Sequence, residues 1–295
     1  MSHHDKVYIL IGSVLPYMSR VNAIKVFRDL LAFLTVIPLG KTEDFVETSA
    51  RNMWLFPFVG GLMGLIAAGY FSASRFILSY VLQLANFLVH IPTSLLLGIL
   101  PPAMTIAFLL VFTGFQHFDG LVDLGNALGL RRIEERREMA HRWVVTYKGA
   151  LLALFVEFSA IAGLFFLSWN IAVRAVVVGE VCAKLAMVTI VWRGKAAHQG
   201  LGARFIGSAK RKANVVAYVG ALIMAFALLG LVGIIAVLVA AVFGVFMDVV
   251  ANSMFGGVSG DMIGATNEAS RALSLVSIAA FSVLVSGLLW GGLFL

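Results

Sequence analysis

Acidic and amide side chains gather in the run 116–126, directly after a long apolar stretch. If this run is helical, Asp119, Asp123 and Asn126 fall at positions i, i+4 and i+7 and share one face. Their oxygens can converge on a hard cation such as Mg²⁺, which takes oxygen ligands. The spacing therefore predicts a metal-dependent site. His117, at the same boundary, is a candidate base or phosphate donor, or else a histidine that only hydrogen bonds the backbone.

A second polar patch, 256–268, combines glycines with two acids. Gly257 and Gly260 let backbone N–H groups approach an anion closely. A helix that begins near Asp261 places Glu268 seven residues further along, on the same face. Such a patch favours a phosphate held together with a metal ion.

The composition describes the setting in which these patches must fold. Of the 295 residues, 61% are hydrophobic and 13% are charged, and the mean hydropathy is +0.98. A soluble globule of this composition would leave large apolar patches in water, so the sequence predicts an integral membrane protein. The net charge of +7 comes from basic residues beside apolar spans, which favours lipid headgroups over nucleic acid as the partner. The single cysteine, Cys182, excludes an intramolecular disulfide.

Seven apolar stretches approach the ~20 residues that a bilayer crossing needs. They are 53–73, 93–115, 149–169, 171–192, 214–231, 232–250 and 272–294. The sequence therefore predicts an all-α fold: a polytopic membrane bundle of about 7 transmembrane helices. Residues 1–20 are expected to be an N-terminal extension, and 21–295 a single membrane-embedded domain.

The basic loops predict the sidedness. Loops 131–148 and 193–212 carry six Lys or Arg each, which places both in the cytoplasm. The basic N-terminal segment should lie on the same side, so an even number of crossings must separate Arg51 from His117. The apolar stretch 76–92 is then expected to be interfacial and not to span.

The sequence also predicts a helix near the N-terminus, and it places several charged residues inside the predicted spans. The stretch from Val21 to Val36 is apolar on one side and is followed by Pro38, which predicts a helix on the membrane surface. Charges inside the predicted spans mark function by default, although Glu180 and Lys184, at i and i+4, are equally expected to pair with each other. The other two such acids are Glu157 and Asp248.

Four motifs, in order, resemble the cobalamin synthase family, the adenosylcobinamide-GDP ribazoletransferases. The resemblance covers roughly residues 27 to 290. The motifs are Phe56-Pro57-Phe58-Val59-Gly60-Gly61-x-x-Gly64, His117-Phe118-Asp119-Gly120-Leu121-Val122-Asp123, Gly200-Leu201-Gly202-x-x-Phe205 and Gly256-Gly257-x-Ser259-Gly260-Asp261-x-Ile263-Gly264-Ala265-x-x-Glu268.

The resemblance implies a Mg²⁺-dependent phosphoryl transfer at the cytoplasmic face of the cell membrane. A ribose hydroxyl of α-ribazole, or of its 5'-phosphate, would attack the phosphate attached to cobinamide, and GMP would leave. Asp119 and Asp123 would be metal ligands, and Asp261 and Glu268 would contact metal or hydroxyl. Such a transfer needs metal and positive groups to neutralise phosphate charge. By charge and location alone, Arg142 and Lys148 are candidates to hold phosphate. The sequence leaves the oligomeric state open, and a homo-oligomer is one of the possibilities.

Two departures from the family pattern keep alternatives open. Asn126 stands where the family usually has a third acid, so it offers a carbonyl oxygen without negative charge. The segment 139–149 lacks the Asp and glycine pair common there, and retains only Gly149. A diverged, non-catalytic homologue is therefore one alternative. A CDP-alcohol phosphotransferase is another, although its Asp-Gly-x-x-Ala-Arg signature is not matched after Asp119-Gly120. A transporter is the third, but the sequence lacks the internal repeats that it would predict.

Overall fold

The computed structural model describes residues 20–40, 43–140, 142, 144–209 and 212–291. Within these residues the fold is all-helical, as predicted, and the only β-type pairing is an isolated parallel bridge between Ala196 and Val258. The elements are α2 (Arg20–Leu34), α3 (Phe45–Arg51), η2 (Met53–Leu55), α4 (Phe56–Leu88), α5 (Thr93–Phe112), α6 (Gln116–Asn126), α7 (Ile133–Ala140), α8 (Tyr147–Phe165), α9 (Trp169–Arg193), α10 (Leu201–Ala209), α11 (Asn214–Phe255) and α12 (Gly260–Gly291). The predicted extension, 1–20, lies almost wholly outside the described residues.

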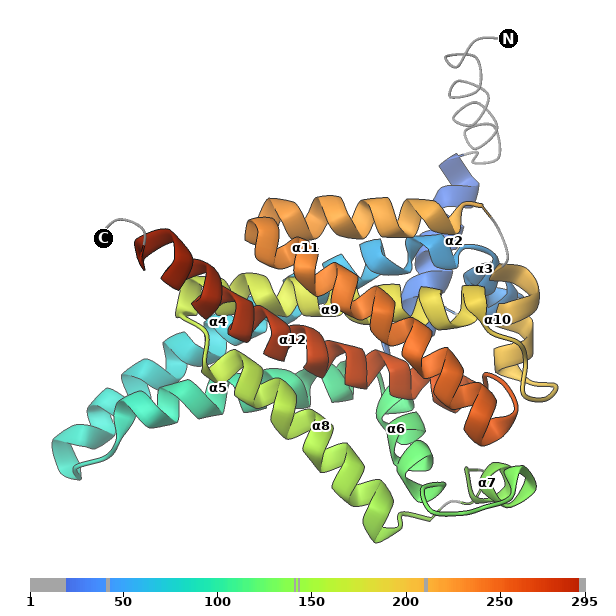
Figure 1. Ribbon diagram of the computed structural model, residues 1–295. Helices are drawn as coiled ribbons and strands as arrows, with labels where there is room; N and C mark the ends of the chain where they lie inside the picture. The colour runs from blue at the N-terminus through green and yellow to red at the C-terminus, as the bar shows by residue number, and fades with distance from the viewer. Residues whose placement is uncertain (1–19, 41–42, 141, 143, 210–211, 292–295) are drawn as a thin grey trace.

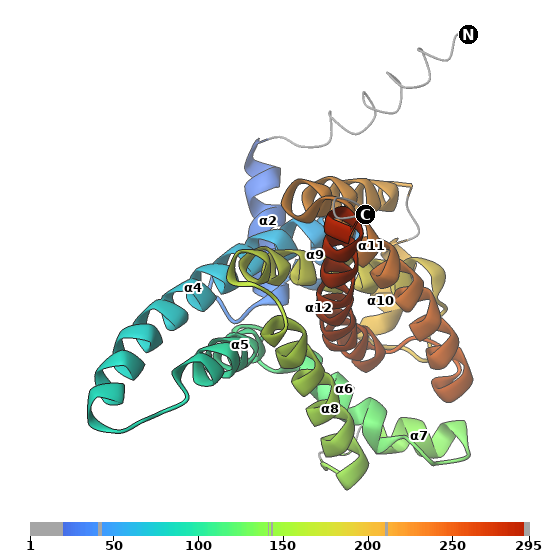
Figure 2. The same cartoon turned by 60° about the vertical axis from the view of Figure 1, so that its left-hand side comes forward.

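Helix α9 forms the centre of the bundle. Its side chains from Ala175 to Val191 are buried without interruption, and α4, α11 and α12 pack around it (Figures 1 and 2). Small residues let the helices approach: a Cβ atom at Gly64 would lie 2.6 Å from the Cα of Val177 on α9. Close backbone packing of this kind is what drives helix association where lipid removes the hydrophobic force.

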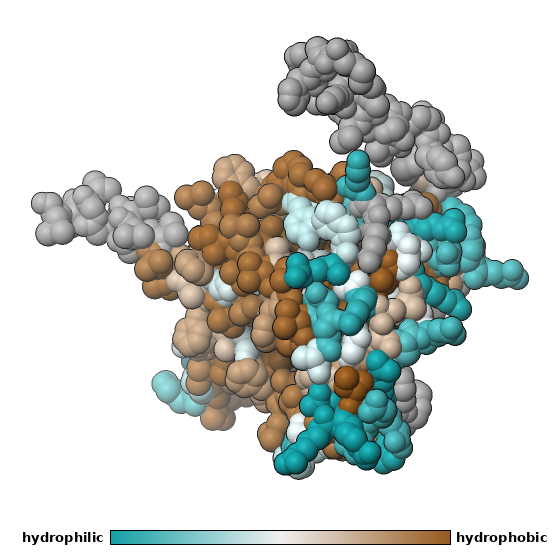
Figure 3. Space-filling model, turned by 45° about the vertical axis from the view of Figure 1, so that its right-hand side comes forward, coloured by the Kyte–Doolittle hydropathy of each residue, from teal (hydrophilic) through white to brown (hydrophobic). Residues whose placement is uncertain are grey.

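Within the described residues, five helices are long and apolar enough to cross a membrane, so the chain is an integral membrane protein. They span Met53–Leu88, Thr93–Phe112, Tyr147–Phe165, Trp169–Arg193 and Asn214–Phe255. Their outward faces carry large apolar side chains, such as Phe76, Phe155 and Val242. Figure 3 shows the hydrophobic residues covering most of one face, while hydrophilic residues gather at one end.

The structure corrects the prediction that the stretch 76–92 is an interfacial piece of its own, because most of it belongs to α4. Helix α4 continues without a break through 33 residues to Leu88, about 50 Å at 1.5 Å per residue. No proline interrupts it after Pro57, and its Gly69 faces open space. Helix α5 then returns beside α4, and the pair projects from the bundle as a hairpin (Figures 1 and 2).

Helix α11 reverses at Gly230. This glycine has φ +57° and ψ −134°, a backbone conformation that a side chain would strain, and Figure 1 shows α11 doubling back on itself. The reversal falls between the predicted spans 214–231 and 232–250. The last predicted span, 272–294, falls largely within α12, whose final residues lie outside the described part.

A sharp turn separates the membrane helix α5 from the site helix α6. Gly114 and Phe115 have left-handed backbones, with φ of 65° and 58°. Two such residues in succession redirect the chain, and the amide of Phe115 donates to the carbonyl of Leu110 at 2.9 Å. Helix α6 therefore leaves α5 at an angle and lies against α12 and α8 (Figure 1).

The predicted helix from Val21 to Val36 is confirmed as α2.

Candidate active site

Three aspartates from two helices line one cavity. Asp119 and Asp123 come from α6, one helical turn apart, and Asp261 comes from the first turn of α12. The cavity measures about 340 Å³, and its other lining residues are Val122, Ala140, Arg142, Val144 and Val145. The two acidic patches that are far apart in the sequence thus meet at one place.

Glycines allow this meeting. A Cβ atom at Gly120 would lie 2.9 Å from the Cα of Asp261, and one at Gly264 would lie 3.1 Å from the Cα of His117. The first contact is too close for a real Cβ atom, so the backbone would have to move, and the second is tighter than most Cβ atoms make. Gly120 therefore sets the separation between the aspartates of α6 and that of α12.

The three aspartates lie close enough together that the negative charge of each makes ionisation of its neighbours less favourable. Burial, and then the nearby charges of Asp119 and Asp261, together raise the pKa of Asp123 to about 7. A cation among these three groups would reverse this effect, because an opposite charge favours the ionised carboxyl.

These residues fit Mg²⁺ only as part of its ligand set. Among the described residues, no three Asp, Glu, His or Cys side chains are close enough to hold a metal ion by themselves. Mg²⁺ in enzymes is usually held by one or two carboxylates together with waters and substrate phosphates. Asp119, Asp123 and Asp261 around an open cavity match that arrangement.

Asn126, predicted as a metal ligand, is not among the residues that line the cavity of the three aspartates. Its Oδ1 accepts hydrogen bonds from the amide of Thr146, at 2.9 Å, and from the hydroxyl of Thr146, at 2.8 Å. Its Nδ2 donates to the carbonyl of Val144 at 2.8 Å. Both lone pairs of the oxygen are thereby used, so Asn126 fastens the segment 144–146 to α6.

The two predicted phosphate holders differ in position. Arg142 lines the aspartate cavity and is exposed, with an ion pair to Glu138 at 2.6 Å. Lys148 instead donates to the carbonyl of Leu128 at 2.9 Å. Arg142 alone is therefore placed to meet a phosphate in this cavity.

Gly257 and Gly260, both predicted to bind an anion, have different surroundings. A Cβ atom at Gly257 would lie 2.6 Å from the backbone of Ala196, because the bridge between Val258 and Ala196 holds the two segments together. The amide of Val258 donates to the carbonyl of Lys195 at 2.7 Å. Gly260 borders a second cavity, which is described below. A Cβ atom at Gly260 would meet only side-chain atoms of Leu201.

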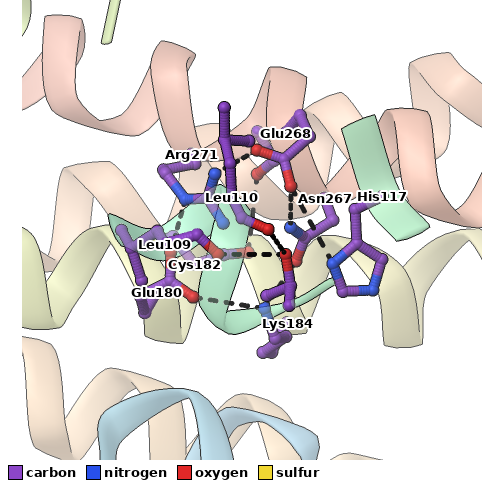
Figure 4. Close-up of polar contacts among 11 residues, drawn as sticks. Leu109, Leu110, His117, Glu180, Cys182, Lys184, Asn267, Glu268 and Arg271 are labelled. Atoms are coloured by element: carbon purple, nitrogen blue, oxygen red, sulfur yellow. Dashed lines mark hydrogen bonds and ion pairs between the residues drawn. The ribbon is translucent and has the colours of Figure 1, made fainter. Parts of the chain in front are cut away.

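Glu268 lies in a buried network of charges, not in the aspartate cavity. It is 1% exposed and pairs with Arg271, which also pairs with Glu180. Lys184 joins the network through Glu180 and Asn267, with Nζ 3.2 Å from Glu180 Oε2 and 2.7 Å from Asn267 Oδ1. Figure 4 shows these side chains converging between α9 and α12.

His117 lies at the edge of this network. Its Nδ1 is 3.8 Å from Glu268 Oε1 and has no hydrogen-bond partner within the described structure. The second nitrogen of the ring points away from the network (Figure 4). His117 thus connects the helix that carries Asp119 to the buried charges.

Charges inside the helices are mostly paired. The predicted pair of Glu180 and Lys184 is confirmed, and Asp248 lies 3.2 Å from Arg193. Glu157 differs, because its buried Oε1 lacks a hydrogen bond to any described residue. The sequence reasoning missed Arg271, although a cation one turn after Glu268 in an apolar stretch is a signal of the same kind.

A second cavity adjoins the first at Asp261, and the sequence reasoning missed it. It measures about 450 Å³ and lies between α2, α6, α9, α10 and α12. Its lining residues are Phe33, Gln116, His117, Met187, His198, Gln199, Gly200, Leu201, Phe205, Gly260, Asp261, Ile263 and Gly264. They come from five separate parts of the chain, so no local pattern reveals them.

The fold and the site together define a polytopic membrane protein with an acidic, phosphate-compatible cavity at one end of its helical bundle. Comparison with known proteins specifies the family. Residues 26–279 match the model of the cobalamin-5-phosphate synthase family, so the chain belongs to that family. No solved structure matches the chain.

Named relatives cover nearly the whole chain. An adenosylcobinamide-GDP ribazoletransferase of Halorubrum lacusprofundi is 32% identical over 269 residues, which are 84% of this chain and 94% of the relative. One of Pyrobaculum islandicum is 30% identical over 264 residues, 88% of this chain and 98% of the relative. One of Methanocella arvoryzae is 28% identical over 276 residues, 86% and 95% respectively. The resemblance stated from the motifs is thereby confirmed.

Proposed function

We propose that this protein joins adenosylcobinamide-GDP to α-ribazole, or to its 5'-phosphate, in a Mg²⁺-dependent phosphoryl transfer. Its membership of the cobalamin-5-phosphate synthase family supports the reaction. The single observation that carries the assignment of the site is the cavity lined by Asp119, Asp123 and Asp261. Three carboxylates and one arginine around an open cavity suit a phosphate that arrives with a divalent cation.

The protein's own groups have separate tasks in this proposal. Bound Mg²⁺ would neutralise the charge of the transferred phosphate. Asp119 and Asp123 would hold the cation, and Arg142 would meet the negative charge that develops on the phosphate oxygens. Asn126 holds the segment 144–146, which forms the cavity wall beside them.

The transfer itself exchanges a phosphoanhydride bond for a phosphoester bond. A ribose hydroxyl attacks the phosphorus attached to cobinamide, a new P–O bond forms, and the bond to GMP breaks. The proton of the hydroxyl passes to Asp261, whose carboxylate borders both cavities. Positioning and charge neutralisation carry most of the catalysis in such transfers.

The topology is part of the proposal. The reversal at Gly230 divides α11 into two crossings, and α12 supplies another, which gives about seven crossings. An even number of crossings, α4 and α5, then separates Arg51 from His117. The basic loops and the aspartate cavity face the cytoplasm, where both nucleotide substrates are available.

The test is a reconstituted reaction. Purified protein in lipid is supplied with adenosylcobinamide-GDP, α-ribazole and Mg²⁺, and the formation of GMP and cobalamin is followed with and without EDTA. We expect product with Mg²⁺ and none with EDTA. Product that persists undiminished in EDTA would exclude the metal, and no product from folded protein would exclude the activity.

A further inference from the structure

The second cavity has the lining of a site for an apolar ring. Phe33 on α2 and Phe205 on α10 have ring centroids 4.9 Å apart, and Met187, Leu201 and Ile263 complete the apolar wall. Apolar walls with a few polar groups are typical of small-molecule sites. The polar side chains here are Gln116 and His117 on α6, His198 and Gln199 just before α10, and Asp261 at the start of α12.

The charges of the cavity exclude a diphosphate as its main occupant. Among the described residues that line it, none is a lysine or arginine, and the one acid is Asp261. A diphosphate would therefore meet no lysine or arginine of the described lining, whereas the aspartate cavity beside it contains Arg142. Burying an anion without a partner is expensive, so the occupant of the second cavity is a neutral group.

The volume selects among the neutral parts of the two substrates. About 450 Å³ lies in the range of sites that enclose a drug-sized ligand. A corrinoid with its side chains is several times larger, so it cannot be enclosed. A nucleoside of either substrate is of the right size.

Polarity separates the two nucleosides. Guanine presents several donors and acceptors along its edge, and those that faced the wall formed by Phe33, Phe205 and Met187 would lack partners, at a cost in affinity. A benzimidazole base presents two ring nitrogens and an otherwise apolar surface. Such a base loses little by contact with Phe33, Phe205 and Met187.

We propose that the second cavity binds the acceptor nucleoside, with the benzimidazole base against Phe33 and Phe205 and the ribose toward Asp261. The inference rests on the proposed function for the identity of the acceptor. Because Asp261 borders both cavities, a ribose in the second cavity presents its hydroxyls to a phosphate in the first. The base is thereby held away from the metal.

Two substitutions test the cavity in the full-length protein in lipid. Phe33→Ala removes part of the ring wall, and Leu201→Trp fills the cavity from a residue that is 42% exposed, so that the helix core is undisturbed. Phe27→Ala is the matched control, because Phe27 lies on the same helix and is not among the lining residues. Each variant is first checked for a monodisperse profile and an unchanged melting temperature.

The primary measurement is equilibrium binding of α-ribazole alone, in EDTA, so that neither turnover nor metal enters. We expect Phe33→Ala and Leu201→Trp each to weaken binding about tenfold, the size of a lost base–aromatic contact, and Phe27→Ala to leave it unchanged. In turnover, the same variants should raise KM for α-ribazole and not KM for adenosylcobinamide-GDP. Leu201→Trp should also favour unsubstituted benzimidazole over the dimethylated base.

The outcomes separate this inference from the proposed function. Binding of α-ribazole that depends on Phe33 in a protein without transferase activity would keep the cavity assignment and overturn the function. Unchanged α-ribazole binding in both variants would overturn the assignment. Weakened GMP binding with unchanged α-ribazole binding would give the cavity to the donor's guanosine. If folded wild-type protein binds no α-ribazole, either alone or with GDP present, the assignment of the second cavity is overturned as well.

Discussion

Asn126 and Thr146 are joined by two hydrogen bonds: the amide and the hydroxyl of Thr146 both donate to Oδ1 of Asn126, at 2.9 and 2.8 Å. With the bond from Asn126 Nδ2 to the carbonyl of Val144, at 2.8 Å, they tie the beginning of α8 to the end of α6. Gly149 makes room for this contact, because a Cβ atom there would lie 3.1 Å from Cγ of Asn126. The side chain that stands in place of a third acid thus has a structural task.

This contact predicts that Asn126→Asp impairs the enzyme. A carboxylate cannot donate to the carbonyl of Val144, and it would place a further negative charge beside Asp123. We expect a loss of about 1 to 3 kcal/mol in stability, the range for an unsatisfied buried group, with lower kcat. A ligand role for Asn126 predicts the opposite, a lower half-saturating Mg²⁺. Thermal unfolding in detergent and a Mg²⁺ titration of activity distinguish the two.

Gly120→Ala should separate the aspartates of the two helices. The added Cβ would meet the backbone of Asp261, which cannot move as a flexible side chain can. We expect kcat to fall at least about tenfold, because small displacements of reacting groups are costly. Gly69→Ala on α4 is the matched control, since a Cβ there meets nothing within 4 Å, and its activity should be unchanged. Full activity in Gly120→Ala would show that the spacing of α6 and α12 is not critical.

Asp119→Asn and Asp261→Asn test the carboxylates without changing side-chain shape. We expect each to lower kcat by about a hundredfold or more, the range for removing a group that stabilises the developing charge. Asp119 is exposed, so its variant should melt at the wild-type temperature. Glu47→Gln, an exposed acid paired only with Arg51 at 3.4 Å, is the control and should keep full activity. Normal turnover in either aspartate variant would remove that residue from the site.

The dependence of activity on Mg²⁺ should change with pH through Asp123. Its pKa is raised to about 7, so below pH 7 the metal must displace a proton from this carboxyl, and above pH 7 it need not. We expect half-saturating Mg²⁺ to fall about tenfold per unit as pH rises toward 7, and then to level. Measured with donor and acceptor saturating, a flat profile between pH 5.5 and 7 would mean that Asp123 stays ionised or does not hold the metal.

The three aspartates that line one cavity could be singled out from the sequence because their signals are local. The spacing of Asp119 and Asp123 in one short helix, and the glycines around Asp261, are visible within a dozen residues each. The reversal at Gly230 was placed by the length of the apolar run. The extent of α4 was missed because nothing in 76–92 distinguishes an interfacial helix from the continuation of a span.

The remaining parts of the site depend on contacts between distant segments. Phe33 and Phe205 lie 172 positions apart in the numbering and meet only when α2 and α10 pack at the same end of the bundle. The packed position of Gly257 likewise depends on its contact with Ala196, since the same glycines alone suit an anion site. Tertiary packing decides between these alternatives, and no local pattern encodes it.

The buried network predicts an asymmetry between two arginines that both pair with acids. Arg271 is 1% exposed and pairs with Glu180 and Glu268, so Arg271→Met removes the arginine that these two buried carboxylates share and leaves Lys184 as the cation beside Glu180. We expect a loss of about 3 to 5 kcal/mol, as for breaking a buried ion pair from one side, seen as a lower melting temperature in detergent. Arg132→Met is the control, because Arg132 and its partner Glu135 are solvent-exposed and such pairs contribute about 0 to 1 kcal/mol. Equal melting temperatures for the two variants would mean that the network around Arg271 does not hold α9 to α12.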